Sequence, residues 1–306
     1  MRNFREMLEA RWAESKFVCV GLDSDSGKLP SSAHRYLAQG DEEEKIVAYI
    51  ITPFNREIVE ATKDIVCAYK TNLAFYTAHG SKGVAALRRS IMIINDIAPD
   101  IPVILDAKYM DTSNTNTGYV KMAFEYCGAD AITISPYLGR EAAKPFLDQE
   151  GKGIFVLCRT SNSGAGEFQD LHTLTIDPFE IPEGMMVSEW MTFLCQKSER
   201  LYERVARNVA HEWNHNGNCG LVVGATCPEE LARVRKIVGD MPLLIPGIGA
   251  EGGDVGKTVK AGKDSRGKGM IINSSRGIIF ASSGPDFAEA AHCETLRLHE
   301  LISQVL

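Results

Sequence analysis

Short apolar runs recur along the chain, and each ends in polar residues or glycine before a segment with helical periodicity. Near-continuous apolar strands that alternate with helices are typical of a parallel sheet covered on its outside. Eight such units close a (β/α)8 barrel, so we predict a single α/β TIM barrel over residues 1–306. A doubly wound open sheet is the alternative, but it rarely needs eight units in one domain. The eight runs begin at Phe17, Ile65, Pro102, Ala131, Gly153, Gly220, Pro242 and Gly269.

Two segments fall outside this repeat. Residues 1–16 have the pattern of an amphipathic N-terminal helix. Residues 164–186, after the fifth strand, carry turn and loop residues and no clear strand. We therefore predict an insertion over the barrel mouth at 164–186, within one undivided domain.

Polar residues collect where the predicted strands end, which is where the loops of a TIM barrel form its active site. Asp106 and Lys108 share one face of the third strand because side chains alternate, whereas Asp111 lies beyond the strand in its loop. An ion-pair plug that merely fills the barrel top is the structural alternative. We favour a functional cluster, because charges gathered at such a mouth more often serve chemistry. The other candidates at strand ends are Asp23, Lys70, Asn72, Ser161, Gly249, Ser275 and Arg276.

Composition narrows the partners. A formal net charge of −7 argues against binding to nucleic acid or to an anionic membrane. No apolar run approaches the roughly 18 residues of a membrane span, so we expect a cytoplasmic protein. Its eight cysteines are dispersed without a C-x-x-C pair, and we predict reduced thiols in the core.

The segment DAKYMDTSNT, from Asp106 to Thr115, matches the D-x-K-x-x-D-x-x-x-T signature of the orotidine 5′-phosphate decarboxylase family. The chain resembles that family from about Phe17 to Ser283, and most of all its longer bacterial branch. Further signatures follow in the same order as VGLD at Val20, AYKTN at Ala68, RTSNSG at Arg159, GLVVGAT at Gly220, PGIGAEGGD at Pro246 and INSSRGI at Ile272.

The resemblance implies decarboxylation of orotidine 5′-monophosphate to uridine 5′-monophosphate, with no cofactor and no metal. Loss of CO₂ leaves a carbanion at C6, and no motif here offers an electron sink, so a fixed ammonium must stabilise it. Lys108 can stabilise that charge and then donate the proton. Asp106 would lie against the substrate carboxylate, and Lys70 and Asp111 would complete an alternating charge network.

The family also implies how the nucleotide is bound. Asp23 and Lys70 would hold the ribose hydroxyls, and Ser161 would recognise the pyrimidine. Arg276 and backbone N–H groups of the last two loops would bind the 5′-phosphate. Asp111 and Thr115 reach the other subunit's site in the family, which implies a homodimer with shared active sites. The substrate-binding set is completed by Asn72, Gly249, Glu251 and Ser275.

Glu251 departs from the family pattern, which usually has a glutamine that bridges phosphate and base. A carboxylate facing a phosphate dianion is repulsive. Either Glu251 turns outward, or it is protonated, or phosphate binding is weaker than usual.

Two other functions compete with this one. A Mg²⁺-dependent sugar-phosphate decarboxylase or aldolase of the same superfamily shares D-x-K-x-x-D but has an acidic ligand at the second strand, where this chain has Lys70. A non-catalytic phosphate-binding barrel, disabled by Glu251, is the second. HEWNH at 211–215 resembles a zinc motif, and we interpret it as accidental. GGDVGKT at 252–258 is one residue short of a P-loop, and we discount it. GIGAEG at 247–252 fits a dinucleotide motif, but we interpret it as a loop that cradles a phosphate without a dinucleotide.

Overall fold

Eight parallel strands close into a barrel in the computed structural model, which describes residues 2–36, 43–174, 184 and 186–306. Around the barrel the strand order is β1-β10-β9-β8-β5-β4-β3-β2. The strands are β1 (Val18–Gly21), β2 (Val66–Asn72), β3 (Val103–Tyr109), β4 (Ala131–Ile134), β5 (Gly153–Arg159), β8 (Cys219–Val223), β9 (Leu243–Pro246) and β10 (Met270–Ser274). All eight predicted strands and the predicted (β/α)8 fold are confirmed.

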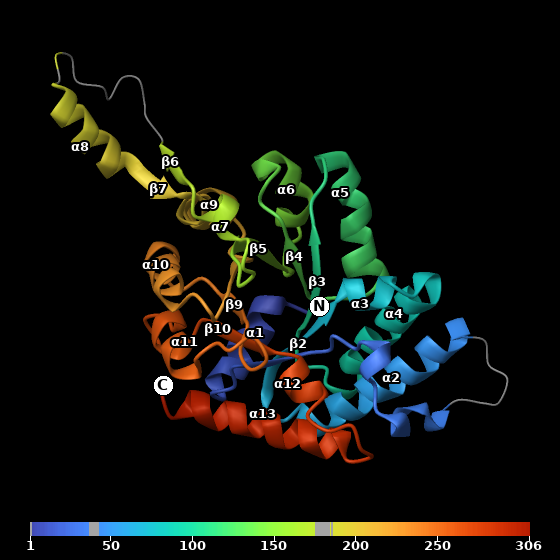
Figure 1. Cartoon of the computed structure of the whole chain (residues 1–306). Helices are drawn as coiled ribbons and strands as arrows, with labels where there is room; N and C mark the ends of the chain where they lie inside the picture. Colours follow the sequence, from blue (N-terminus) through green and yellow to red (C-terminus); the bar gives the residue numbers. More distant parts are fainter. Residues whose placement is uncertain (1, 37–42, 175–183, 185) are drawn as a thin grey trace.

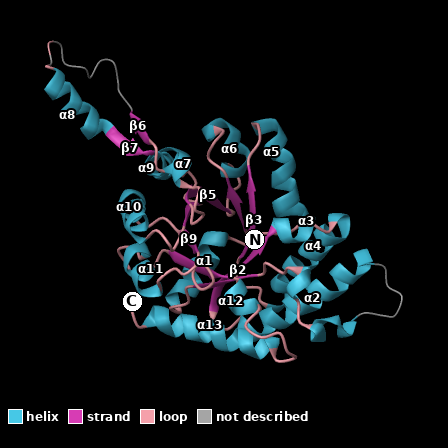
Figure 2. Cartoon of the chain, viewed as in Figure 1, coloured by secondary structure: helices cyan, strands magenta, loops and turns pink. Residues whose placement is uncertain are grey.

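Helices surround the strands, as the colouring by secondary structure shows (Figure 2). Each barrel strand is followed in the chain by a helix of the outer layer: α2 (Glu43–Thr62), α4 (Gly80–Ile97), α5 (Ser113–Val120), α6 (Gly139–Leu147), α9 (Leu201–Asn208), α10 (Pro228–Val238), α11 (Val255–Gly262) and α13 (Phe287–Ser303). Shorter pieces are η1 (Ser26–Lys28), η2 (Ser31–Tyr36), α3 (Leu73–Thr77), the π-helical η3 (Lys121–Tyr126) and η5 (Val209–Trp213), and α12 (Arg276–Ile279). No helix of the described residues is long and apolar enough to cross a membrane.

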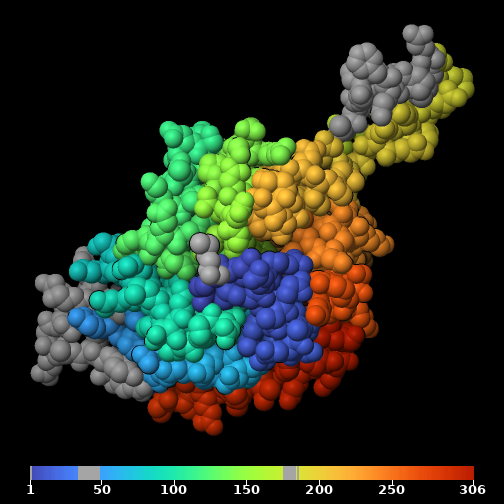
Figure 3. All heavy atoms as spheres, turned by 180° about the vertical axis from the view of Figure 1, so that it is seen from behind, coloured from blue at the N-terminus to red at the C-terminus, as the bar shows by residue number. Residues whose placement is uncertain are grey.

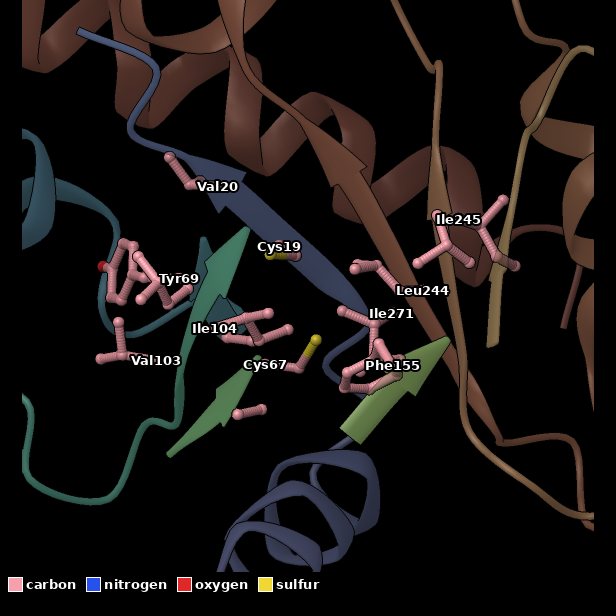
Figure 4. Packing of buried hydrophobic residues seen from close by; sticks show 14 of the residues in the cluster. Cys19, Val20, Cys67, Tyr69, Val103, Ile104, Phe155, Leu244, Ile245 and Ile271 are labelled. Carbon is pink, nitrogen blue, oxygen red and sulfur yellow. The ribbon is translucent and has the colours of Figure 1, made fainter. Parts of the chain in front are cut away.

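The core of the barrel is apolar. Its packed side chains include Cys67, Ile104, Phe155, Leu244 and Ile271, all at most 1% exposed (Figure 4). Five of the eight cysteines are buried, as predicted for the whole set. The prediction is wrong for the rest, because Cys195 and Cys293 are exposed and Cys227 is partly buried.

The N-terminal helix α1 (Phe4–Ala13) closes the end of the barrel where the strands begin. Seen from behind, the N-terminal segment covers the middle of that face (Figure 3). The Trp12 indole N–H donates to the Met270 carbonyl at 2.8 Å, at the start of β10. Gly153 begins β5 without a side chain because a Cβ there would lie 2.5 Å from the Phe4 ring. The open end of the barrel is therefore the opposite one.

The predicted insertion contains more regular structure than expected. Its described part includes α7 (Gly166–Gln169) and β6 (His172–Leu174), and residues 175–183 and 185 lie outside the described chain. Strand β6 pairs antiparallel with β7 (Ser198–Arg200), which follows α8 (Val187–Lys197). Strands β6 and β7 and helix α8 form an arm that projects from the barrel (Figure 1). The strand β6 was not predicted, because its partner lies 26 residues away and neither strand exceeds three residues.

Candidate active site

The open end of the barrel holds a cavity of about 600 Å³. Of the twelve predicted site residues, nine line it: Asp23, Lys70, Asn72, Asp106, Lys108, Ser161, Glu251, Ser275 and Arg276. Gly249, Asp111 and Thr115 are not among the lining residues. The ends of the predicted strands thus meet at one cavity, as expected for a barrel built from alternating strands and helices.

Charges alternate along a chain of contacts across four side chains. The Lys70 ammonium lies 3.4 Å from Asp23 Oδ1 and 3.1 Å from Asp106 Oδ2. Lys108 Nζ lies 2.7 Å from the other oxygen of Asp106, so both residues do project to the same side of β3. Two carboxylates and two ammonium groups therefore compensate one another at the mouth.

Burial makes these pairings strong. The Lys70 and Asp106 side chains are 4% and 12% exposed, whereas the Lys108 side chain is 48% exposed. Burial alone would favour the neutral amine of Lys70, but Asp23 and Asp106 outweigh it and raise the pKa of Lys70. Burial would likewise favour the neutral acid of Asp106, but Lys70 and Lys108 hold the pKa of Asp106 well below its usual range. Lys70 and Asp106 both stay ionised. Of the two ammonium groups in the network, that of Lys108 is the one that faces open space.

Lys108 owes its position to an unusual backbone. Its φ is 53°, one of two positive values among the described residues other than glycine, and the pairing of β3 with β4 shifts register between Leu105 and Tyr109. A left-handed residue with a side chain costs roughly 1–2 kcal/mol and must be held by its surroundings. Thr133 on β4 provides that support, because its hydroxyl accepts from the Lys108 amide at 2.9 Å and donates to Asp106 Oδ1 at 2.8 Å.

A second group of side chains faces this network from the loops that follow β5, β9 and β10. Ser161 Oγ donates to Glu251 Oε2 at 2.7 Å, and Arg276 lies 3.9 Å from Glu251 Oε1. Glu251 therefore points into the cavity, and the outward orientation, one of the three alternatives, is not the one that this structure shows.

Asp111 and Thr115 are placed apart from this cavity. The Asp111 amide donates to Asn116 Oδ1, and the Asp111 carboxylate accepts from the Thr112 amide. Thr115 is exposed on α5, with its hydroxyl 3.3 Å from that of Thr112. Within this chain, the charge network runs through Asp23, Lys70, Asp106 and Lys108, without the expected Asp111.

Some residues at the site were not singled out from the sequence. Thr133 lies inside an apolar strand, where a β-branched residue is ordinary filling. Gln169 lines the cavity from the insertion, and its side chain exchanges hydrogen bonds with Thr160. Asn273 also lines it, yet its position in a strand resembled a core residue. The tertiary structure brings these residues to the barrel mouth, so the local sequence pattern does not reveal them.

Comparison with known proteins agrees with the architecture and the motifs. Residues 16–181 match the "Orotidine 5′-phosphate decarboxylase / HUMPS family". The orotidine 5′-phosphate decarboxylases of Cupriavidus metallidurans and Azoarcus sp. are 44% and 43% identical to this chain over 302 residues, which is 98% of each protein. The solved structure of Leishmania donovani OMP decarboxylase superposes with a TM-score of 0.73 at 34% identity, covering 97% of this chain and 99% of that one. With two relatives more than 40% identical over almost the whole sequence, this chain belongs to the orotidine 5′-phosphate decarboxylase family.

Proposed function

We propose that this protein decarboxylates orotidine 5′-monophosphate to uridine 5′-monophosphate, a step of pyrimidine biosynthesis, without a cofactor. The observation that carries the proposal is the contact chain Asp23–Lys70–Asp106–Lys108 at the barrel mouth. It offers one fixed cation to open space and a fixed anion beside it. That pair suits a reaction in which an anionic carboxylate leaves and a carbanion forms.

Lys108 is the proposed electrostatic and acid catalyst. The departing CO₂ leaves an electron pair at C6, and the Lys108 ammonium stabilises that pair before transferring a proton to it. Its 2.7 Å contact with Asp106 and the Thr133 bond to its backbone fix the ammonium in advance. A preorganised cation needs little reorganisation when the charge appears.

Asp106 has two roles in this scheme. It holds the ammonium groups of Lys70 and Lys108 in place, and it opposes the substrate carboxylate, a repulsion that is relieved as CO₂ departs. We assign the larger part of the rate to Lys108, because stabilisation of developing charge is usually the largest catalytic contribution.

The remaining lining residues bind the nucleotide. Asp23 and Lys70 would hold the ribose hydroxyls, and Asn72 lies beside them at the end of β2. Ser161 would contact the pyrimidine. Arg276 and the backbone N–H groups near Gly249 and Ser275 would bind the phosphate, in the last two loops of the barrel where such sites are common.

We further propose a homodimer in which Asp111 and Thr115 complete the partner's site. The support within this chain is that neither residue lines its own cavity, although Asp111 follows β3 by only two residues. Their loop opens α5 on the exposed surface.

The test is a turnover assay that follows uridine 5′-monophosphate, with and without EDTA. We expect EDTA to leave the rate unchanged, because a divalent cation beside the Lys70 ammonium would be repelled. Loss of the rate in EDTA would favour the Mg²⁺-dependent alternative. Absence of turnover under both conditions would favour the non-catalytic phosphate-binding barrel.

A further inference from the structure

Glu251 contacts two groups that the proposed function assigns to opposite ends of the nucleotide. Its Oε2 accepts a hydrogen bond from Ser161 at 2.7 Å, and its Oε1 lies 3.9 Å from the Arg276 guanidinium. We infer that Glu251 is a resident anion, held between Ser161 and Arg276, whose carboxylate a phosphate must displace in order to bind Arg276. This inference rests on the assignment of Arg276 to the phosphate.

The loop that carries Glu251 is built to bring its side chain into the cavity. Gly247, Gly249 and Gly252 have φ of 107°, 87° and 82°, a region in which residues with side chains are strained. A Cβ at Gly247 would lie 3.2 Å from Glu251 Oε2, so a side chain there would press on the carboxylate. The glycines therefore admit Glu251 to the wall facing Ser161.

The loop backbone is tied, whereas the side chain can move. The Gly253 amide donates to the Gly247 carbonyl at 3.0 Å, and the Gly252 amide donates to the Gly249 carbonyl at 2.9 Å. The Glu251 side chain is 42% exposed and that of Arg276 is 53% exposed. Glu251 can thus leave by rotating its side chain toward solvent, without opening the loop.

A bound phosphate and the observed position of Glu251 oppose each other by charge. A phosphate on Arg276 would lie within a few ångströms of the Glu251 carboxylate, and like charges at that distance repel even in a high effective dielectric. Displacing Glu251 also releases the Ser161 hydroxyl for a new partner. The exchange therefore links the phosphate end of the site to the pyrimidine end.

This linkage makes Glu251 a determinant of specificity. Inorganic phosphate can offset the displacement of the Glu251 carboxylate only through its contacts with Arg276. A nucleotide gains contacts with both Arg276 and Ser161. We expect the site to discriminate strongly against inorganic phosphate relative to nucleotide. A glutamine at this position would keep an acceptor for Ser161 and remove the charge that opposes phosphate.

The experiment measures dissociation constants for inorganic phosphate, uridine 5′-monophosphate and uridine by calorimetry. In Glu251→Gln we expect the constants for phosphate and for the nucleotide to fall by about three- to tenfold, in the range of a partly exposed charge interaction. The constant for uridine should change less than twofold. Glu167→Gln is the matched control, since it removes the same charge from an exposed residue of α7 that does not line the cavity.

Arg276 supplies the second arm. If Glu251 acts by opposing phosphate on Arg276, the fold increase in phosphate affinity caused by Glu251→Gln should be less than half as large in an Arg276→Ala background. The inference is overturned if Glu251→Gln binds phosphate within twofold of the wild-type affinity, or binds no phosphate at all. It is also overturned if Glu167→Gln raises the phosphate affinity equally, or if Glu251→Gln still raises it fully in the Arg276→Ala background.

These outcomes are separable from the proposed function. Phosphate binding is measured without turnover, so a gain in Glu251→Gln together with an inactive wild type would contradict only the decarboxylation. If the wild type is active but Glu251→Gln does not change the phosphate affinity, only the inference that Glu251 is a resident anion is contradicted.

Discussion

At the scale of single residues, the site depends on one hydroxyl as well as on its charges. Thr133 is 1% exposed and joins the Asp106 carboxylate to the Lys108 amide. The positive φ of Lys108 leaves its backbone in a conformation that needs such support. We therefore regard Thr133 as a positioning residue for the ammonium.

Thr133→Val keeps the shape of the side chain but removes both hydrogen bonds. We expect kcat to fall by about 10- to 100-fold, because roughly 1.4–2.7 kcal/mol of preorganisation is lost. KM should change by less than about threefold, since the nucleotide contacts remain, and Thr133→Ser should restore most of the rate. Steady-state kinetics of the three proteins provide the measurement. A valine variant with wild-type kcat would show that Lys108 is held by other contacts.

The sequence predicted the charged residues of the site better than the neutral ones. Lys70, Asp106 and Lys108 stand out because charges at the end of an apolar strand have few structural explanations. Thr133 could not be found this way, because its role exists only through the pairing of β3 with β4. The inward orientation of Glu251 depends on loop glycines whose φ values the sequence does not specify.

At the scale of elements, stability and chemistry are placed at opposite ends of the barrel. The strands begin against α1, which buries Phe4, Leu8 and Trp12, and they end at the charged mouth. The strand positions followed from their continuous apolar runs, whereas β6 and β7 are too short and too polar to be recognised. Substitutions beneath the barrel should therefore change stability and leave substrate binding intact.

Trp12→Ala tests this separation. Trp12 is 1% exposed and hydrogen bonded to Met270, so its truncation should lower the free energy of unfolding by about 3–5 kcal/mol. Guanidinium unfolding measures that loss, and KM of the folded fraction should stay at the wild-type value. The control is Trp190→Ala on the projecting helix α8, which has no buried residue and should cost less than about 1 kcal/mol. Equal losses in the two variants would refute the role of α1 as the closure of the barrel.

At the scale of the whole molecule, the proposed site belongs to two chains. Asp111 and Thr115 lie outside their own cavity, so each would serve the other subunit across a two-fold interface. In a dimer of this kind, two inactivating substitutions on different chains can fall in the same active site and leave the other site intact.

Mixing inactive chains tests the sharing. When Lys108→Ala and Asp111→Ala chains are unfolded and refolded together, a mixed dimer collects both lesions in one site and neither in the other. Random association makes half of the dimers mixed and half of their sites intact, so roughly a quarter of wild-type activity should return. If Asp111 serves its own barrel, every site keeps one lesion and no activity reappears.

The central claim is that the Lys108 ammonium carries out the chemistry while other residues bind the nucleotide. Its most direct test is Lys108→Ala, assayed for uridine 5′-monophosphate formation and for binding of that product by calorimetry. We predict that kcat falls below the detection limit, because the cation and the proton source are lost together, while the product still binds within about tenfold of wild type. A variant that retains more than a few per cent of kcat would contradict the account, because the proton would then come from another group.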